Sequence, residues 1–216
     1  FIDSAGDWSP DGSKFIFTVF AQGDNELAIV DVESGTIERK IDLDGIGALT
    51  SPSWSPDGQY IAFSGLDGGV SDIYTWDITT GALRQLTNDK FSDFQPTWSP
   101  DGSTIAFVSD RGRETNFESL EYSKPLIAFL DVETAQVTTL SVFGTGKQMN
   151  PQFAPDGRSI YFISDQDGFS DIYQYVFTTA DVRRITRLQT GVSGITSMSP
   201  AFSVARQAGT ILFSVF

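Results

Sequence analysis

The side chains that carry much of enzyme chemistry are missing from this sequence. It has 216 residues and contains no His and no Cys. Without His there is no Ser-His-Asp or Cys-His catalytic set and no imidazole metal ligand, and without Cys there is no thiolate nucleophile, disulfide or cysteine-bound zinc. Any chemistry must therefore use carboxylates, hydroxyls, Lys or bound calcium.

One acidic segment has the spacing that begins a calcium-binding loop. Asp165, Asp167 and Asp171 follow that spacing, but the twelfth position is Val176 in place of the bidentate Glu. Hairpin geometry explains these residues better, because an Asp also precedes Ile-Tyr in another part of the chain. We therefore expect no cofactor, with these three carboxylates as the only calcium candidates. Nothing in the sequence places two carboxylates at the separation that a glycosidase needs.

The charge and hydropathy of the chain exclude several kinds of partner. There are 14 Lys and Arg against 28 Asp and Glu, a net charge of −14, so a phosphate backbone would be repelled and no nucleic acid partner is expected. The sequence has no apolar run of the roughly 20 residues that span a bilayer, so no transmembrane segment is expected. The start at Phe1-Ile2-Asp3 lacks a Met and a basic region, which predicts mature or excised material.

A five-residue motif returns along the chain and sets its organisation. Trp-Ser-Pro-Asp-Gly begins at Trp8, Trp54 and Trp98, Phe-Ala-Pro-Asp-Gly begins at Phe153, and a worn fifth copy begins at Phe202. These aromatic anchors are 46, 44, 55 and 49 residues apart, which is the period of a propeller blade or a long helical repeat. Short β-branched and aromatic runs between turn residues, with no helical periodicity, favour the propeller.

Each complete unit predicts four antiparallel strands, A to D. Ser-Pro-Asp-Gly is expected to form the A–B hairpin, because Pro presets φ, Asp bonds back to the backbone and Gly adopts the left-handed conformation. Strand B, such as Ile61-Ala62-Phe63, is apolar on both faces, and the aromatic anchors are expected to lie in the core between blades. The expected blades of this single propeller domain span approximately residues 1–43, 44–88, 89–141, 142–188 and, in part, 189–216.

The fifth unit contains only strands A and B. The sequence therefore predicts an all-β propeller with four complete repeats and a half repeat, whereas propellers usually have four to eight blades. Two interpretations stay open: an open fragment of a larger propeller, or a five-bladed ring whose last blade has two strands. In an open arc, the remaining blades or another chain would have to cover the fifth blade.

The repeat resembles the TolB-like (WD40-like) β-propeller repeat. Its pattern is Pro-x-Trp-Ser-Pro-Asp-Gly-x-x-Ile-Ala-Phe, then Ser-Asp-Ile-Tyr-x-x-Asp, then Arg-Gln-Leu-Thr. Unit two matches it at Pro52, Trp54, Ser55 to Gly58, Ile61, Phe63, Ser71 to Tyr74, Asp77 and Arg84 to Thr87. The resemblance covers nearly the whole chain and implies a propeller in a periplasmic or extracellular setting. The family includes periplasmic partner-binding proteins, peptidase gating domains and orphan surface modules, so the resemblance specifies the fold more closely than the function.

The connections between strands vary in length mainly on one face of the predicted disc. In each of the first four units, nine residues separate the anchor from the last Phe of strand B, but the third B–C connection is ten residues longer than the others. Loops that accept insertions on a fixed scaffold are frequent binding sites. The candidate partner-binding residues of this insertion, which spans roughly residues 111–124, are Arg111, Arg113, Phe117, Tyr122 and Lys124.

A second candidate site lies where the strands A meet at the axis of the disc. An X-Pro pair precedes every anchor after the first, and small polar groups around an axis suit a peptide tail or a bound ion. The competing interpretation is that Pro is merely tolerated on an edge strand and that the channel holds only water. The candidates at this channel mouth are Ser51, Gln95, Asn150 and Ser199.

Together these observations favour a non-enzymatic module that binds a protein or peptide partner. One alternative is the substrate-gating propeller of a prolyl-oligopeptidase-like serine peptidase. Its catalytic domain would lie outside this chain, which shows no Gly-x-Ser-x-Gly elbow between a strand and a helix. Another alternative is a structural module of a surface assembly, in which the open fifth unit pairs with another chain.

Overall fold

The computed structural model describes residues 6–21, 24–196, 200–205 and 209–215. These residues form β-strands and loops, and they include no helix with the length and hydropathy that a membrane crossing requires. The strands in chain order are β1 (Asp7–Trp8), β2 (Lys14–Ala21), β3 (Asp24–Asp31), β4 (Ile37–Ile41), β5 (Ala48–Trp54), β6 (Tyr60–Asp67), β7 (Val70–Asp77), β8 (Leu83–Gln85), β9 (Asp93–Trp98), β10 (Thr104–Ser109), β11 (Leu126–Asp131), β12 (Val137–Thr139), β13 (Gln148–Phe153), β14 (Ser159–Ser164), β15 (Asp171–Val176), β16 (Asp181–Arg184), β17 (Phe202–Ala205) and β18 (Thr210–Phe213).

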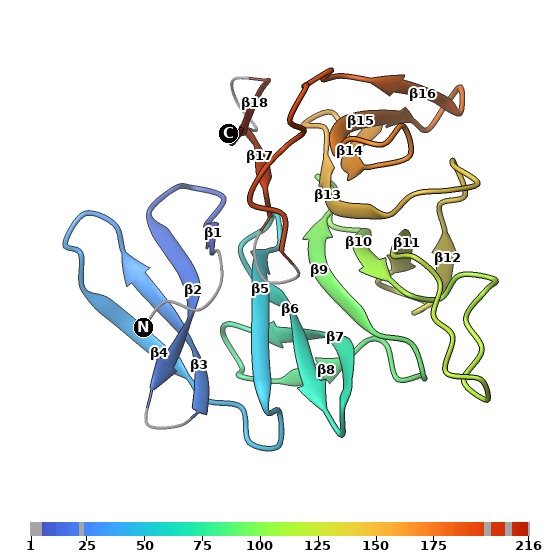
Figure 1. The fold of residues 1–216 in the computed structure, drawn as a ribbon. Helices are drawn as coiled ribbons and strands as arrows, with labels where there is room; N and C mark the ends of the chain where they lie inside the picture. Colours follow the sequence, from blue (N-terminus) through green and yellow to red (C-terminus); the bar gives the residue numbers. More distant parts are fainter. Residues whose placement is uncertain (1–5, 22–23, 197–199, 206–208, 216) are drawn as a thin grey trace.

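The strands form five antiparallel sheets in chain order. Four sheets have four strands each, β1 to β4, β5 to β8, β9 to β12 and β13 to β16, and the fifth is the hairpin β17–β18. The first strands of the sheets lie toward the middle of the molecule, and β4, β12 and β16 lie toward its edge (Figure 1). The predicted all-β propeller architecture, with four complete blades and a half blade, is confirmed.

The Ser-Pro-Asp-Gly segments form the A–B hairpins through one repeated set of contacts. In the third blade the Ser99 hydroxyl donates to Asp101 Oδ1 (2.6 Å), and the Ser103 N–H donates to the same oxygen (3.0 Å). Gly102 has a φ of +74°, which an L side chain rarely adopts. These donors lower the pKa of Asp101, and their counterparts lower the pKa of Asp11 to about 2.

The core lies between successive sheets. Ile61, an apolar residue of strand B in the second blade, has no exposed surface. The anchors Trp54 and Trp98 are 3% and 4% exposed. The Trp98 indole N–H donates to the Ser53 carbonyl of the preceding blade (3.2 Å). The prediction that all anchors are core is wrong for Trp8, which is 54% exposed, because no described strand covers its side of the first sheet.

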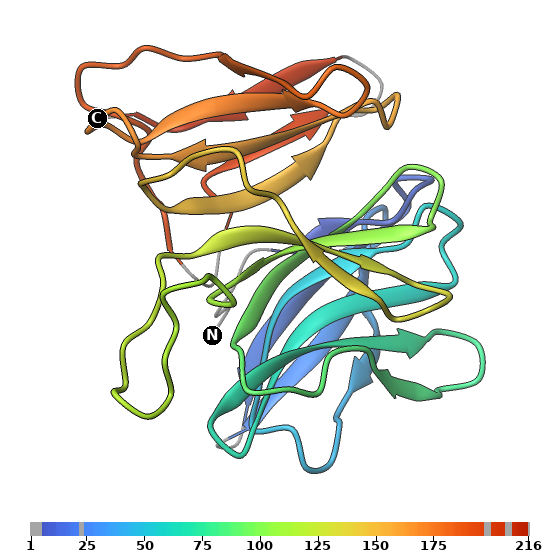
Figure 2. The same cartoon turned by 90° about the vertical axis from the view of Figure 1, so that its right-hand side faces the viewer.

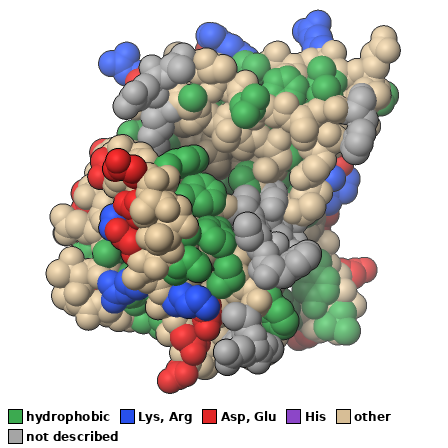
Figure 3. Space-filling view, turned by 90° about the vertical axis from the view of Figure 1, so that its left-hand side faces the viewer, with side chains coloured by type: hydrophobic (Ala, Val, Ile, Leu, Met, Phe, Trp, Pro, Cys, Tyr) green, Lys and Arg blue, Asp and Glu red, His purple; other side chains and the backbone are tan. Residues whose placement is uncertain are grey.

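The described strands form an open arc. No strand of the first sheet packs against β17 or β18 among the described residues. Figure 3 views the side of the first sheet, where hydrophobic side chains gather at the surface. On the first sheet, the centroid of the exposed Trp8 ring lies 5.1 Å from that of Phe15. The uncovered face of the first sheet is therefore apolar, as expected for an arc rather than a closed ring.

The fifth hairpin has a different register from the complete blades. In those blades the anchor pairs with the first residue of the apolar triplet, as Trp54 pairs with Ile61. In the fifth, Phe202 pairs with Phe213, the last residue of the corresponding triplet. The compact Pro-Asp-Gly turn that sets the register is absent there, so β17 continues for three residues beyond its anchor.

Candidate functional site

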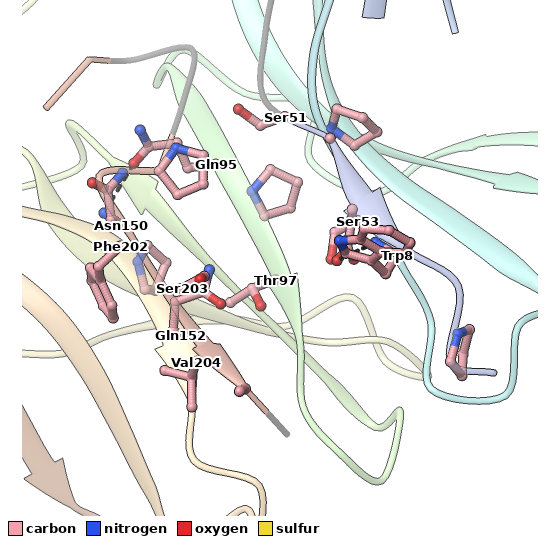
Figure 4. A pocket seen from close by; sticks show the side chains of 18 of the residues that line it. Trp8, Ser51, Ser53, Gln95, Thr97, Asn150, Gln152, Phe202, Ser203 and Val204 are labelled. Carbon is pink, nitrogen blue, oxygen red and sulfur yellow. Dashed lines mark hydrogen bonds between the residues drawn. The ribbon is translucent and has the colours of Figure 1, made fainter. Parts of the chain in front are cut away.

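A cavity of about 420 Å³ lies where the first strands of the five sheets meet. We call it the axial cavity; it is lined by residues of β1, β5, β9, β13 and β17 and of the segments next to them. Figure 4 shows Gln95 and Asn150 beside one another on one side of the cavity, with Trp8 and Ser53 on the other. The structure thus places Ser51, Gln95 and Asn150, which the sequence predicted at the channel mouth, on the wall of one cavity. Ser199, the fourth predicted residue, lies outside the described residues.

The three predicted residues share an unusual backbone conformation. Ser51, Gln95 and Asn150 have φ values of +51°, +55° and +52°, in the left-handed region that side chains other than Gly seldom adopt. Each precedes a Pro and lies where the register of its strand with strand B shifts. The X-Pro pair is therefore a β-bulge, which interrupts the ladder and redirects the X side chain toward the axis.

These side chains also connect neighbouring blades. Gln95 Oε1 accepts a hydrogen bond from the Asn150 N–H (3.0 Å), and its Nε2 donates to the Thr196 carbonyl (2.7 Å). Asn150 Oδ1 in turn accepts from the Ala201 N–H (2.9 Å). Asn150 is 1% exposed, and its Nδ2 has no hydrogen-bond partner among the described residues. One buried amide donor is thus left over at the cavity wall.

The wall of the axial cavity is polar but almost without charge. Its only ionisable side chain among the described residues is Asp7, whose Oδ1 and Oδ2 accept from the N–H groups of Trp8 (2.9 Å) and Trp54 (2.8 Å). Ser53, Thr97, Gln152 and Ser203 contribute hydroxyl and amide groups, and Pro10, Pro52, Pro96, Pro151 and Pro200 contribute ring faces. Such a wall offers hydrogen bonds and apolar contact, without an acid–base pair.

The insertion of the third blade, roughly residues 111–124, is held at its base by Arg111. The Arg111 guanidinium contacts Asp93 (2.5 Å) and Asp89 (3.0 Å) and lies over the Phe91 ring at 5.1 Å from its centroid. The side chain of Arg111 is only 9% exposed and that of Asp93 is fully buried. Burial raises the pKa of Asp93 to about 6 against the opposing effect of the guanidinium. Arg111 is therefore engaged within the fold.

The other predicted residues of the insertion lie nearer the surface. Phe117 packs against Phe91 with centroids 5.4 Å apart and against Tyr122 at 6.3 Å. Tyr122 is 57% exposed, and Arg113 and Lys124 are also exposed. The insertion projects away from the sheets (Figure 2, yellow-green), so these four side chains are placed where a partner can reach them, and their binding role stays a prediction.

The sequence did not point to Leu120, the most exposed large hydrophobic side chain of the insertion. Leu120 is 69% exposed and has a φ of +55° in a tight turn closed by paired backbone hydrogen bonds between Asn116 and Glu121 (2.8 and 3.0 Å). Asn116 Oδ1 also accepts from the Glu118 N–H (2.9 Å). No local signal marks a Leu for the left-handed region, so only the structure identifies it.

The three calcium candidates do not converge. Asp171 accepts from Arg184 Nη2 (2.5 Å) and from the Thr186 hydroxyl (2.6 Å), while Asp167 accepts from Arg184 Nη1 (3.2 Å). Asp165 accepts a backbone N–H from the segment before β13 (2.8 Å). Within the described ranges, no group of three or more acidic side chains is arranged to hold a metal ion. These carboxylates therefore accept hydrogen bonds within the fourth blade and do not form the calcium-binding cluster that their spacing resembles.

Among the solved structures that are similar to this chain, two are described as TolB proteins. One, assigned as TolB, is from Agrobacterium tumefaciens: it is 28% identical with a TM-score of 0.72, over 88% of this chain and 63% of that chain. The other is TolB from Acinetobacter baumannii, at 24% identity and a TM-score of 0.70, over 92% of this chain and 47% of that chain. This chain thus spans less than two thirds of the length of either protein. No curated protein matches it.

A family model agrees with the repeat and with the fold. The model described as the TolB beta propeller domain matches residues 4–117, slightly more than half of the chain. Those residues contain the first two blades and much of the third, including three Trp-Ser-Pro-Asp-Gly motifs. Together with the four-stranded sheets around an axis, this match shows that the chain belongs to the TolB β-propeller domain family.

Proposed function

We propose that this chain is a non-enzymatic binding module whose axial cavity receives an extended segment of a partner protein. The proposal rests on one observation: the first strands of all five sheets contribute a wall of neutral polar side chains and prolines to a single cavity. A volume of about 420 Å³ lies within the range of common ligand sites, and it accommodates a few residues of a polypeptide.

The chemistry of the wall supports binding over catalysis. Only Asp7 is ionisable among the described lining residues, and both of its oxygens already accept backbone N–H groups. General acid–base catalysis needs a positioned proton donor and acceptor, and this wall has no such pair. The bulges at Ser51, Gln95 and Asn150 interrupt the β-ladders next to the cavity, which favours recognition of a peptide backbone.

The proposal includes an extracytoplasmic location. It is supported by the TolB-like repeat and is compatible with the absence of Cys and with the acidic composition. Cell fractionation of the source organism, with antibodies against this chain, tests the location. Recovery in the cytoplasmic fraction alone would contradict it without affecting the binding proposal.

A photo-crosslinking experiment tests the binding role. A benzophenone amino acid at Gln152, on the cavity wall, should form an adduct with an envelope protein, whereas the same group at exposed Thr138 on β12 should not. Thr97→Trp, which fills the cavity with an indole, should abolish that adduct, and Thr138→Trp should leave it unchanged. If Thr97→Trp does not fold, Gln152→Trp replaces it, with capture measured by pull-down. If the variant with a filled cavity captured as much of the envelope protein as the unsubstituted chain, the proposal would be overturned.

The insertion provides a second candidate surface for a partner. Exposed Leu120 and Tyr122 stand on a turn held by hydrogen bonds, and such preorganised apolar groups are common at protein interfaces. Leu120→Ala together with Tyr122→Ala should weaken capture if this surface contributes. If capture then depends only on this pair and not on Thr97→Trp, the partner docks on the insertion and the axial cavity is not the site.

A further inference from the structure

A groove of about 500 Å³ lies between the first and second blades, on the side of the A–B turns. Its floor includes Ile29 and Trp54, which are each 3% exposed. Lys14 and Arg39 of the first blade and Ile78 of the second also line it. The groove is separate from the insertion. The first strands of the five sheets line the axial cavity, whereas residues of β3 and β4 also line the groove.

The corresponding place between the second and third blades is filled by an aromatic ring. The strand registers make Tyr60 the counterpart of Lys14, because Lys14 pairs with Asp31 at the end of strand C and Tyr60 pairs with Asp77 there. The Tyr60 ring lies 6.5 Å from the ring of Trp98, the anchor of the next blade. A ring on strand B thus covers the anchor at this second interface.

Between the third and fourth blades, rings from strand C and from the turn after it lie at the same place. Phe129 and Phe177 stand at the positions that Ile29 and Ile78 occupy around the groove, two residues before and one residue after the end of strand C. With Phe153, the anchor of the fourth blade, they form a cluster with centroid distances of 6.3, 5.8 and 6.1 Å. Rings from different positions of the repeat therefore lie beside the anchor at two of the three interfaces between complete blades.

The first interface has no such ring, and the indole N–H of its anchor makes no hydrogen bond with a described residue. At the second interface the ring stands at the position of Lys14, and at the third interface the rings stand at the positions of Ile29 and Ile78; the first interface has a ring at none of these three positions. The Trp54 indole N–H is buried and has no partner among the described residues, whereas the corresponding N–H of Trp98 donates to Ser53. The first interface therefore has no ring beside its anchor, and the groove lies at that place.

The charges at the rim favour a cation beside the ring. Lys14 is already paired with Glu38, and Arg39 lies over the Trp76 ring at 4.4 Å and donates to the Ile78 carbonyl (2.7 Å). The exposed carboxylates of Asp11 and Asp57 line the groove, and neither forms an ion pair among the described residues. A chain with a net charge of −14 adds to this negative potential.

We propose that this groove binds an aromatic side chain of a partner polypeptide that carries basic residues next to the aromatic one. The ring occupies the volume that Tyr60 fills at the second interface and packs on Trp54, and the basic residues face Asp11 and Asp57. Burial of a ring in a pocket with a charged rim is a common source of binding energy at protein interfaces. The groove shares Ser9 and Pro10 with the axial cavity, but Trp54, Asp11 and Asp57 line only the groove, so the two proposals can fail separately.

Short peptides test the proposal through the indole N–H signals in a proton–nitrogen NMR spectrum of the full chain. The peptide Gly-Lys-Tyr-Lys-Gly should shift the Trp54 signal in a saturable way. Gly-Lys-Leu-Lys-Gly, which lacks the ring, and Gly-Glu-Tyr-Glu-Gly, which reverses the charge, should each bind at least tenfold more weakly. Binding of all three peptides with equal affinity, or of none, would overturn the proposal.

A substitution copied from the neighbouring interface supplies the matched variant. Lys14→Tyr places at the first interface the ring that Tyr60 places at the second, so it should fill the groove and weaken the lysine peptide at least tenfold. Lys147→Tyr makes the same change away from the groove and should leave the affinity unchanged. If Lys14→Tyr does not fold, Ile29→Phe, copied from Phe129, serves the same purpose. Undiminished binding by a folded, filled variant would place the peptide elsewhere and refute this site.

Discussion

At the scale of single residues, the buried contact between Arg111 and Asp93 makes the stability of the fold depend on pH. The side chain of Asp93 is fully buried, and burial raises its pKa from 3.8 to about 6 although Arg111 lies 2.5 Å away. The native state therefore holds the Asp93 proton more tightly than the unfolded chain does. This contribution to stability is complete below about pH 4 and is lost as the pH rises through about 6.

Arg111→Ala should lower the free energy of unfolding by an amount that depends on pH. At pH 8 the variant must either keep a buried carboxylate at Asp93 without its opposite charge or bind a proton there, and both cost free energy, so we expect a loss of about 3 kcal/mol or more in the free energy of unfolding. At pH 5 Asp93 is protonated in the native state, so the loss should be clearly smaller. Urea unfolding at the two pH values measures both. Arg113→Ala, an exposed neighbour, should change little at either pH, and an equal loss for Arg111→Ala at both would contradict the account.

At the scale of elements, one polar contact recurs where strand C begins. The Thr87 hydroxyl donates to Asp72 Oδ1 (3.1 Å) and accepts the Ile73 N–H (2.9 Å), and the fourth blade repeats this with Thr186 and Asp171, at 2.6 Å. The sequence spacing is fifteen residues in both blades. In the second and fourth blades, the Thr that follows the last strand thus attaches the end of the outer hairpin to strand C.

Thr87→Val removes this contact without changing the size of the side chain. Because Thr87 is 3% exposed and Asp72 is 5% exposed, the variant leaves a buried acceptor and a buried N–H unpaired. We expect a loss of about 1–3 kcal/mol in the free energy of unfolding, measured by urea denaturation. Thr139→Val on an exposed position of β12 should cost well under half as much. Equal effects of the two substitutions would remove the structural role assigned to this contact.

At the scale of the whole molecule, the fold is a series of similar sheets, each stabilised mainly by its neighbours. Trp54 and Trp98 are nearly buried because a preceding blade covers them, whereas Trp8, at the same place in the repeat, is 54% exposed. The energetic value of an anchor should therefore follow its position in the arc, as in other repeat proteins whose units contact only their neighbours.

Two Ala substitutions at equivalent anchors measure this position dependence. Trp98→Ala should cost about 3–5 kcal/mol, because it opens a cavity between two blades and removes the hydrogen bond to Ser53. Trp8→Ala should cost about 1 kcal/mol or less, because more than half of that side chain is already in water. Thermal or urea unfolding of the two variants gives the comparison. Similar costs would show that something covers Trp8 in solution.

The sequence by itself determined the strands, the hairpins and the place of the insertion. These follow from local chemistry: Pro-Asp-Gly closes a turn wherever it occurs, and β-branched and aromatic runs form strands. The tertiary structure decided what those elements do together. It placed Ser51, Gln95 and Asn150 around one cavity, buried Arg111 and left Trp8 exposed. Equivalent residues of a repeat have the same local sequence, but their burial depends on which blade packs beside them. Burial is therefore decided only when the blades pack into the arc.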